Sequence, residues 1–198
     1  IRGLVGSEMC IRDRPIATYK LIEPNHWTLK VPVDQCSTDL DREELARDLI
    51  ETMKEYNGLG LSANQVGLKE RAFVMYKDVN KRETLACFNP HVLEYSKEKV
   101  LMDEGCLSYP GLWLKINRPT AVIVEFENES GTNEQFQLYG LESRIFQHEM
   151  DHMQGKDFRD HVSKLKLNMA LKRIKKQQKK LDILEKRDSS VAKMSQLG

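Results

Sequence analysis

The stretch AVIVEFENESGTNEQFQLY, residues 121–139, decides the fold class of this chain. Its two outer runs, AVIVEFE and EQFQLY, have the composition that is typical of short β-strands. The segment between them, NESGTN at 128–133, is rich in residues that favour tight turns. The pattern therefore predicts an antiparallel hairpin.

Strand-like runs continue upstream of this hairpin. The runs AFVMY at 72–76 and LACF at 85–88 have the same texture, so a block of consecutive strands is expected over about 72–139. Helical patterns lie before and after this block. Helices that are separated from a run of strands indicate an α+β domain and not an alternating parallel α/β domain.

The first predicted helix spans about 41–57. Its apolar residues recur at helical spacing and form one stripe, which we assign to core packing: Leu45, Ala46, Leu49, Ile50 and Met53. Thr38 or Asp39 can cap the start of this helix, and Gly58 can end it.

Two more helices are predicted after the strands. One spans about 139–154 and can end at Gly155. The other spans about 162–187, contains no Pro or Gly and is rich in Lys. Residues 189–198 (SSVAKMSQLG) are expected to form a frayed end.

The length of 198 residues suits one domain of ordinary size with an appendage. We expect a main domain over 15–165 and a basic helix and tail over 166–198. Residues 1–14 (IRGLVGSEMCIRDR) show no periodicity and are set aside as a disordered leader or an artefact. The four cysteines, Cys10, Cys36, Cys87 and Cys106, are not expected to form a disulfide framework.

The balance of charge is nearly even. Lys and Arg number 31 against 30 Asp and Glu, so the formal net charge is +1, which excludes nucleic-acid binding by the overall charge but not by a local patch. No apolar stretch is long enough to span a bilayer, and the first residues lack the apolar core of a secretory signal. A cytoplasmic location without a membrane partner is therefore expected.

The segment QHEMDH, residues 147–152, lies within the second predicted helix. Residues four apart share a helix face, so His148 and His152 can present two imidazoles to one metal ion. Glu149 can then serve as general base toward a water molecule at that ion. This pattern alone suits a zinc protease equally well. The remaining histidines, His26, His91 and His161, are expected to be surface or structural residues.

The segment EGCLS, residues 104–108, offers a thiolate after a strand-like stretch. A catalytic metal site needs three protein ligands and an open position, and Cys106 completes that number with the two histidines. A third segment, GLGLSANQ at 58–65, has glycines that permit close backbone approach, and Gln65 brings an amide that can donate to a developing oxyanion. Alone, the third segment would indicate no function.

Together, GLGLSANQ, EGCLS and QHEMDH resemble the three signature motifs of the peptide deformylase family, in the same order. The resemblance runs over about 17–165 and departs at Ser62, where alanine is commoner. It implies antiparallel β-sheets packed around a central metal-binding helix, with an N-terminal and a C-terminal helix. It also implies that the catalytic domain, 15–165, hydrolyses the formyl group from the N-terminal formyl-methionine of nascent polypeptides.

The same resemblance implies roles for single residues. The metal ligands would be Cys106, His148 and His152, and the catalytic residues would be Glu149, which transfers protons, with the Gln65 amide and the Leu107 backbone N–H facing the oxyanion. Glu104 and Arg118 are expected to form an ion pair that supports the ligand loop. The family usually holds Fe²⁺, with Zn²⁺, Ni²⁺ or Co²⁺ as possible substitutes, and the sequence does not decide among them.

A pocket for the methionine side chain is implied as well. The matching positions, besides Leu107, are Leu59, Gly60, Leu61, Leu141 and Ile145. Leu61 and Leu141 could equally belong to the core. Arg144 departs from family members that carry an apolar residue here, and it is expected at the pocket rim or in solvent.

The basic helix resembles the C-terminal helix with which bacterial deformylases dock near the ribosomal exit tunnel. Its apolar residues form a partial stripe: Leu167, Leu171, Ile174 and Leu181. Ribosomal RNA phosphate would be the partner of its lysines, and a merely solvated helix is the alternative.

Two other functions remain open. A zincin-type metallopeptidase would need a third ligand downstream of His152 and no essential Cys106. A ribosome- or RNA-binding module with a structural metal would need a closed site of four ligands.

Overall fold

The computed structural model describes residues 16–194, with only the backbone for residue 181 and residues 185–194. The predicted leader, 1–14, lies outside the described residues. The three α-helices are α1 (Arg42–Glu55), α2 (Gly140–Met153) and α3 (Lys164–Met194). The strands are β1 (Gly60–Ser62), β2 (Ala72–Asp78), β3 (Glu83–Tyr95), β4 (Lys99–Glu104), β5 (Leu114–Pro119), β6 (Ala121–Glu127) and β7 (Asn133–Tyr139). Short 3₁₀ turns are η2 (Trp27–Lys30), η3 (Ala63–Val66) and η4 (Phe158–His161).

The strands form two antiparallel sheets. One has five strands in the order β1-β2-β3-β6-β7, and the other consists of β4 and β5 alone. The predicted α+β class is therefore confirmed, as are the four predicted strand runs. The sequence did not predict β1, which has only three residues, or β5. It indicated β4 only as a strand-like stretch before EGCLS, because β4 is exposed along almost its whole length.

The predicted hairpin is formed by β6 and β7. Val122 pairs with Leu138 and Val124 with Phe136, so both strands turn apolar side chains to the same face. In the turn, the Asn128 side-chain oxygen accepts from the backbone N–H groups of residues 130 and 132. This is the local hydrogen bonding for which Asn is favoured in turns.

The start of α1 differs from the prediction. Asp41 is the N-cap, and its carboxylate accepts from the backbone N–H of Glu44 at 2.9 Å. Thr38 and Asp39, the two predicted caps, are therefore wrong.

At its other end, α1 stops at Glu55, and Asn57 adopts the left-handed conformation (φ 54°), so the predicted end at Gly58 is wrong. The predicted stripe of α1 packs against β1, β2 and β3, with Ile50 only partly buried.

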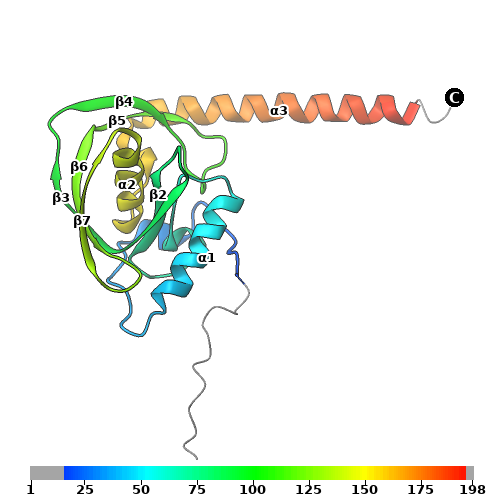
Figure 1. The fold of residues 1–198 in the computed structure, drawn as a ribbon. Helices are drawn as coiled ribbons and strands as arrows, with labels where there is room; N and C mark the ends of the chain where they lie inside the picture. Colours follow the sequence, from blue (N-terminus) through cyan, green and yellow to red (C-terminus); the bar gives the residue numbers. More distant parts are fainter. Residues whose placement is uncertain (1–15, 195–198) are drawn as a thin grey trace, which may run out of the picture.

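Helix α2 lies in the middle of the molecule, inside the curved five-stranded sheet (Figure 1). It contacts β1, β2, β6 and β7 of that sheet as well as β5 of the other. Every residue from Ser143 to Met153 is buried. Because this stretch includes an arginine, two histidines and two acids, its charges must find partners inside the protein.

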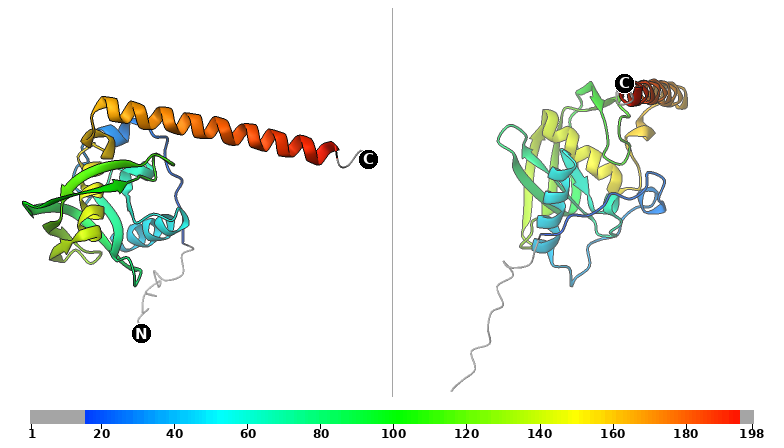
Figure 2. Two further views of the ribbon diagram at one scale, coloured as in Figure 1. Left: turned by 90° about the horizontal axis from the view of Figure 1, so that it is seen from above. Right: turned by 90° about the vertical axis from the view of Figure 1, so that its right-hand side faces the viewer.

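Helix α3 projects away from the body of the protein (Figures 1 and 2). Its first turns pack, through Leu167, Ala170 and Ile174, against a cluster that contains Ile116 and Phe158. It runs to Met194, seven residues beyond the predicted end at 187, so the predicted fraying from 189 is wrong for 189–194. None of the described helices is both long enough and apolar enough to cross a membrane.

Candidate metal centre and adjoining pocket

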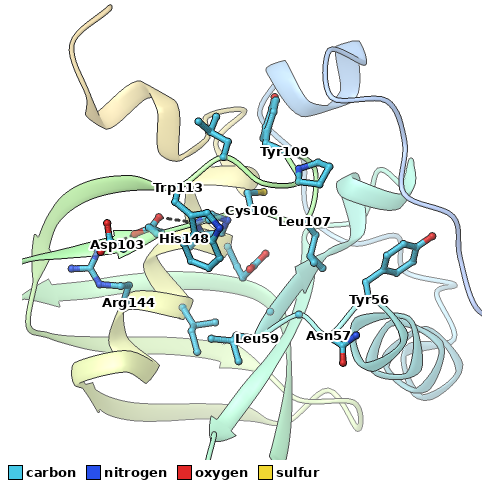
Figure 3. Close-up of a pocket in the computed structure, with 18 of the residues that line it drawn as sticks. Tyr56, Asn57, Leu59, Asp103, Cys106, Leu107, Tyr109, Trp113, Arg144 and His148 are labelled. Carbon is cyan, nitrogen blue, oxygen red and sulfur yellow. Dashed lines mark hydrogen bonds and ion pairs between the residues drawn. The ribbon is translucent and has the colours of Figure 1, made fainter. Parts of the chain in front are cut away.

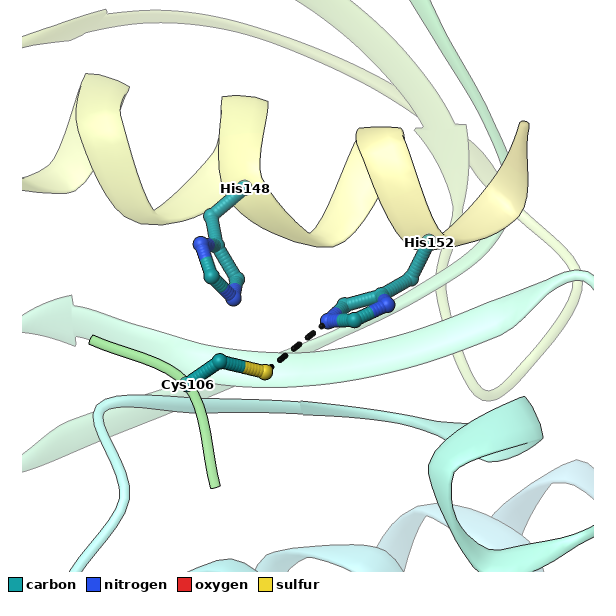
Figure 4. A group of neighbouring side chains, drawn as sticks. All are labelled: Cys106, His148 and His152. Atoms are coloured by element: carbon teal, nitrogen blue, oxygen red, sulfur yellow. Dashed lines mark hydrogen bonds between the residues drawn. The ribbon is translucent and has the colours of Figure 1, made fainter. Parts of the chain in front are cut away.

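The imidazoles of His148 and His152 lie one turn apart on α2 and point toward the thiol of Cys106, on the loop after β4 (Figure 4). The ligand atoms of the three side chains lie within 4.8 Å of one another, and Cys106 Sγ is 3.3 Å from His152 Nε2. Donors held at about 2.0–2.3 Å by a tetrahedral ion are about 3.3–3.8 Å apart. The two nitrogens and the sulfur therefore fit a divalent transition-metal ion.

Glu104, the last residue of β4, fixes the ring of His148. Its Oε1 lies 2.7 Å from His148 Nδ1, so this nitrogen donates and Nε2 is left free to bind an ion. The predicted ion pair with Arg118 is present, with bonds of 2.9 Å from Nε and 2.6 Å from Nη2. Burial opposes ionisation of Glu104, but the bonds from Arg118 and His148 hold its pKa well below the usual range.

The ion pair extends to a second carboxylate, which lies one turn after His148 on α2. Arg118 Nη2 also donates to Asp151 Oδ2 at 2.8 Å, and His161 Nε2 lies 2.7 Å from the same oxygen. His161 is thus a structural residue, as expected. Among the described side chains, Cys106, His148 and His152 form the only group of three or more His, Cys, Asp or Glu residues that could hold a metal ion, and His161 is not part of it. A zincin-type site with a downstream ligand is therefore disfavoured.

Arg144 does not point to solvent. It is 4% exposed and donates to Glu104 Oε2 at 3.0 Å, to the Ile116 carbonyl at 3.2 Å and to the Val100 carbonyl at 2.8 Å. The residue borders the pocket from α2 (Figure 3). Of the two expected positions, solvent is wrong, because the buried carboxylate and carbonyls supply partners that the sequence did not reveal.

Glu149 follows the first histidine ligand and is buried, and its Oε2 has no hydrogen-bond partner among the described residues. Burial raises its pKa to about 7, although the neighbouring imidazoles of His148 and His152 act in the opposite direction. Gly60 lies directly against it. A Cβ at this position would collide with the Glu149 carboxylate and lie 3.0 Å from Ile145, so only glycine fits.

The amide of Gln65 is buried and held at both ends. Its Oε1 accepts from the backbone N–H and the hydroxyl of Ser62, at 2.9 and 3.0 Å. Its Nε2 donates to Ser108 Oγ at 3.0 Å and faces Cys106 Sγ at 3.4 Å. These bonds assign the orientation of the amide, with the nitrogen toward the metal ligand.

A pocket of about 400 Å³ opens beside these residues (Figure 3). Five of the six positions predicted for the methionine pocket line it: Leu59, Gly60, Leu107, Leu141 and Ile145. Leu61 does not, because it is fully buried in the core between α1 and the sheet. The sequence motifs did not indicate Tyr56, Asn57, Tyr109, Pro110 or Trp113, although Tyr109 and Pro110 directly follow the EGCLS segment.

The chain is similar to known proteins of one family. The model of the family described as polypeptide deformylase matches residues 18–168. The peptide deformylase of Rhizobium meliloti is 36% identical over 158 residues, which cover 79% of this chain and 90% of the relative.

Solved structures of similar proteins belong to the same family. The peptide deformylase of Synechococcus elongatus in complex with actinonin has a TM-score of 0.73 and 32% identity, and the match covers 78% of this chain and 86% of that one. The class I type b peptide deformylase of Acinetobacter baumannii, with Met-Ala-Ser bound, has a TM-score of 0.69 and 28% identity over 75% of this chain and 100% of that one.

Proposed function

The chain belongs to the polypeptide deformylase family, and from this premise we propose that it removes the formyl group from the N-terminal formyl-methionine of nascent polypeptides. One observation carries the proposal: Cys106, upstream in the sequence, meets His148 and His152 in space. The Met-Ala-Ser bound to the Acinetobacter baumannii relative supports a peptide with an N-terminal methionine as the product.

We propose that Cys106, His148 and His152 hold one divalent ion, with Fe²⁺ as the native metal and Zn²⁺, Ni²⁺ or Co²⁺ as substitutes. When bound, the ion would polarise the formyl oxygen and make water a better nucleophile. Burial disfavours the Cys106 thiolate, but the imidazoles of His152 and His148 outweigh it and lower the pKa of Cys106 to about 5. The thiolate form that binds transition metals therefore prevails at neutral pH.

Glu149 is proposed to take a proton from the attacking water and to deliver one to the departing amine. A general base is most effective when its pKa is near the working pH, and burial brings the pKa of Glu149 to about 7. Its unpartnered Oε2 is available for this transfer.

Gln65 and the backbone N–H of Leu107 are proposed to donate to the oxyanion that forms on the formyl group. The bonds from Ser62 hold the Gln65 amide in place before the substrate arrives, so its orientation costs nothing during the reaction. Glu104 and Arg118 would support the ligands from behind, through His148.

The methionine side chain is proposed to enter the pocket between Leu59 and the α2 residues Leu141 and Ile145, beside Leu107. These side chains are apolar and suit a thioether. Leu61, which packs in the core, is left out of this proposal.

The test combines metal analysis with two substrates. Protein purified without oxygen should contain about one equivalent of ion per chain and should release formate from a formyl-Met peptide but no acetate from its acetylated analogue. Gln65→Ala should reduce turnover by about 100- to 1,000-fold while keeping the metal. A folded, metal-loaded wild-type protein that releases no formate would overturn the proposal.

Docking of α3 at the ribosome is proposed as a second feature. Its exposed basic residues outnumber its acidic ones over the described side chains: Lys164, Lys166, Lys172, Arg173, Lys175, Lys176, Lys179 and Lys180. RNA phosphate is a suitable partner for them, and binding should weaken as salt rises. The same role, together with the nascent substrate, supports a cytoplasmic location.

Deletion of residues 176–198 tests docking, because it keeps Leu167, Ala170 and Ile174, which pack α3 against the body. The shortened protein should deformylate peptides like the wild type but sediment less with ribosomes at low salt. Equal sedimentation at every salt concentration would remove the docking proposal and leave deformylation untouched.

A further inference from the structure

Arg144 places a charge in a wall where the methionine pocket needs apolar surface. The guanidinium is almost completely buried, and its Nε has no partner among the described residues. Burying an arginine is costly unless its contacts compensate, and a leucine would pack here without that cost. The contacts of the guanidinium must therefore compensate for the cost of its burial.

The contact that stands out is Glu104. Each oxygen of this carboxylate receives two donors: Oε1 from His148 Nδ1 and Arg118 Nη2, at 2.7 and 2.6 Å, and Oε2 from Arg118 Nε and Arg144 Nη1, at 2.9 and 3.0 Å. Arg118 approaches from β5, whereas His148 and Arg144 approach from α2. The carboxylate cannot rotate without losing bonds to both elements.

The charges around Glu104 also balance only when Arg144 is counted. Two buried carboxylates, Glu104 and Asp151, share the single guanidinium of Arg118. Arg144 adds the second positive charge, at 3.0 Å from Glu104. Without it, one guanidinium would serve two carboxylates behind the metal ligand.

Arg144 also connects helix α2 to strands β4 and β5. It sits one turn before His148 on α2, and its other bonds go to the carbonyls of Val100 in β4 and Ile116 in β5. The residue therefore fixes the distance between the helix that carries the histidines and the small sheet that carries Glu104.

We propose that Arg144 is a positioning residue that acts through Glu104 on His148, so that Nε2 of this histidine points to the ion site before an ion arrives. The inference rests on the proposed function, since it concerns the metal ligands named there. A ligand that is already oriented binds more tightly, and loss of such a support typically costs about 10- to 100-fold in metal affinity or activity.

The experiment measures Co²⁺ affinity by titration of the chelator-treated full chain, followed by the visible absorption of the thiolate-ligated ion. Arg144→Met keeps the unbranched stem but loses the guanidinium, and it should bind Co²⁺ about 10- to 100-fold more weakly than the wild type. Arg144→Lys keeps the charge but lacks the planar fork of donors that reaches the carboxylate and both carbonyls, so it should be intermediate.

Arg71→Met is the matched control. Arg71 is half-buried, also has an unpartnered Nε, and donates to the carbonyls of Val33, Met153 and Pro90. It does not touch Glu104 or any ligand side chain. Its loss should lower the temperature of thermal unfolding and leave Co²⁺ affinity and the absorption spectrum as in the wild type.

The outcomes separate the possible roles. An Arg144→Met protein that unfolds at a lower temperature but binds Co²⁺ like the wild type would overturn the proposal. So would a variant that changes only the preference between formyl-methionyl and formyl-norleucyl peptides, because Arg144 would then merely shape the pocket. If Arg144→Met does not fold, wild-type Co²⁺ affinity and spectrum in Arg144→Lys would overturn the proposal by themselves.

Failure of the proposed function would look different. The wild-type protein would then bind Co²⁺ but release no formate from a formyl-Met peptide. The effect of Arg144 on Co²⁺ affinity and on the spectrum is read without any substrate, so the two failures are distinguished.

Discussion

Two clusters of buried charge lie around the loop that carries Cys106, and they use the same chemistry for different purposes. In the Glu104 cluster (Glu104, Arg118, Arg144, Asp151), a carboxylate held by arginines contacts the ligand His148. In the Asp157 cluster (Lys30, Tyr109, Asp157, Arg159), a carboxylate held by Arg159 and Lys30 contacts no metal ligand.

The Asp157 cluster instead joins three segments of chain. Lys30 in η2 donates to Asp157 at 2.6 Å, and the Tyr109 hydroxyl, three residues beyond Cys106, donates to the Pro24 carbonyl at 2.6 Å. The guanidinium of Arg159 lies 3.8 Å over the Tyr109 ring. The cations of the Asp157 cluster are also more exposed than those of the Glu104 cluster. The side chains of Lys30 and Arg159 are 40% and 21% exposed, whereas both arginines of the Glu104 cluster are 4% exposed.

We infer from this difference that a buried charge cluster affects ion binding only if it contacts a metal-ligating side chain. Burial of charge alone is not sufficient. We expect the Glu104 cluster to control both ion binding and stability. The Asp157 cluster should control stability alone, by holding the N-terminal segment and the Cys106 loop together.

The largest effect is expected from Glu104→Gln. An amide has one acceptor oxygen where the carboxylate serves four donors, so Arg118 and Arg144 both lose the negative charge of Glu104 and part of their hydrogen bonding. Breaking a buried pair in this way typically costs about 3–5 kcal/mol in the free energy of unfolding. Co²⁺ affinity should also fall by about 10- to 100-fold. Urea unfolding and Co²⁺ titration measure the two effects separately, and an unchanged affinity would contradict the comparison.

Asp157→Asn is the matched change in the other cluster and should have a smaller effect. The amide keeps the size of the side chain but loses the charge that holds Lys30 and Arg159. The free energy of unfolding should fall by about 1–3 kcal/mol, while Co²⁺ affinity stays at the wild-type value. A loss of affinity as large as that of Glu104→Gln would show that both clusters tune the site.

The pH dependence of stability provides a third test. Burial opposes ionisation of Asp157, but the bonds from Arg159 and Lys30 hold its pKa well below the usual range. A pKa that is lower in the folded state adds stability above the unfolded value of about 3.9, and this stability is lost as the pH falls through the folded pKa.

The difference in unfolding free energy between the wild type and Asp157→Asn should therefore be full at pH 7 and shrink below about pH 4. Urea unfolding of both proteins with chelator present removes any contribution from ion release. A difference that stays constant down to pH 3 would show that the charge of Asp157 does not account for the loss.

The sequence predicted the parts of the fold that have local causes. The hairpin of 121–139 follows from its turn residues, and the buried face of α1 follows from its helical spacing. Strand β5 escaped because its inward positions are Leu114, Ile116 and Arg118, and an arginine in that series does not look like a core residue. Its burial depends on Glu104, which lies in another strand.

The same limit applies to the site. The spacing in QHEMDH and the thiol in EGCLS predicted the three donors that the structure brings together. The pocket rim was one of two positions predicted for Arg144, but its bond to Glu104 was not predicted, because Glu104 is 40 residues away in the sequence. The Asp157 cluster was missed for the same reason: the separation of Lys30 and Asp157 is 127 residues.

The smallest effect is expected from Tyr109→Phe, which removes only the hydroxyl from the Asp157 cluster. The hydroxyl loses its donation to the Pro24 carbonyl and the bond that it accepts from Arg159 Nη2, but the ring remains beneath Arg159. A hydrogen bond of this kind contributes about 0.5–1.5 kcal/mol, so the free energy of unfolding should fall by that amount while Co²⁺ affinity is unchanged.

Tyr76→Phe is the control for this change. Both tyrosines are 8% exposed, but the Tyr76 hydroxyl makes no hydrogen bond to the described residues. Its removal should therefore alter urea unfolding less than Tyr109→Phe does. If the two variants were equally stable, the bond from the Cys106 loop to the N-terminal segment would contribute nothing to the free energy of unfolding. The stability due to the Asp157 cluster would then come from Asp157 and its two cations alone.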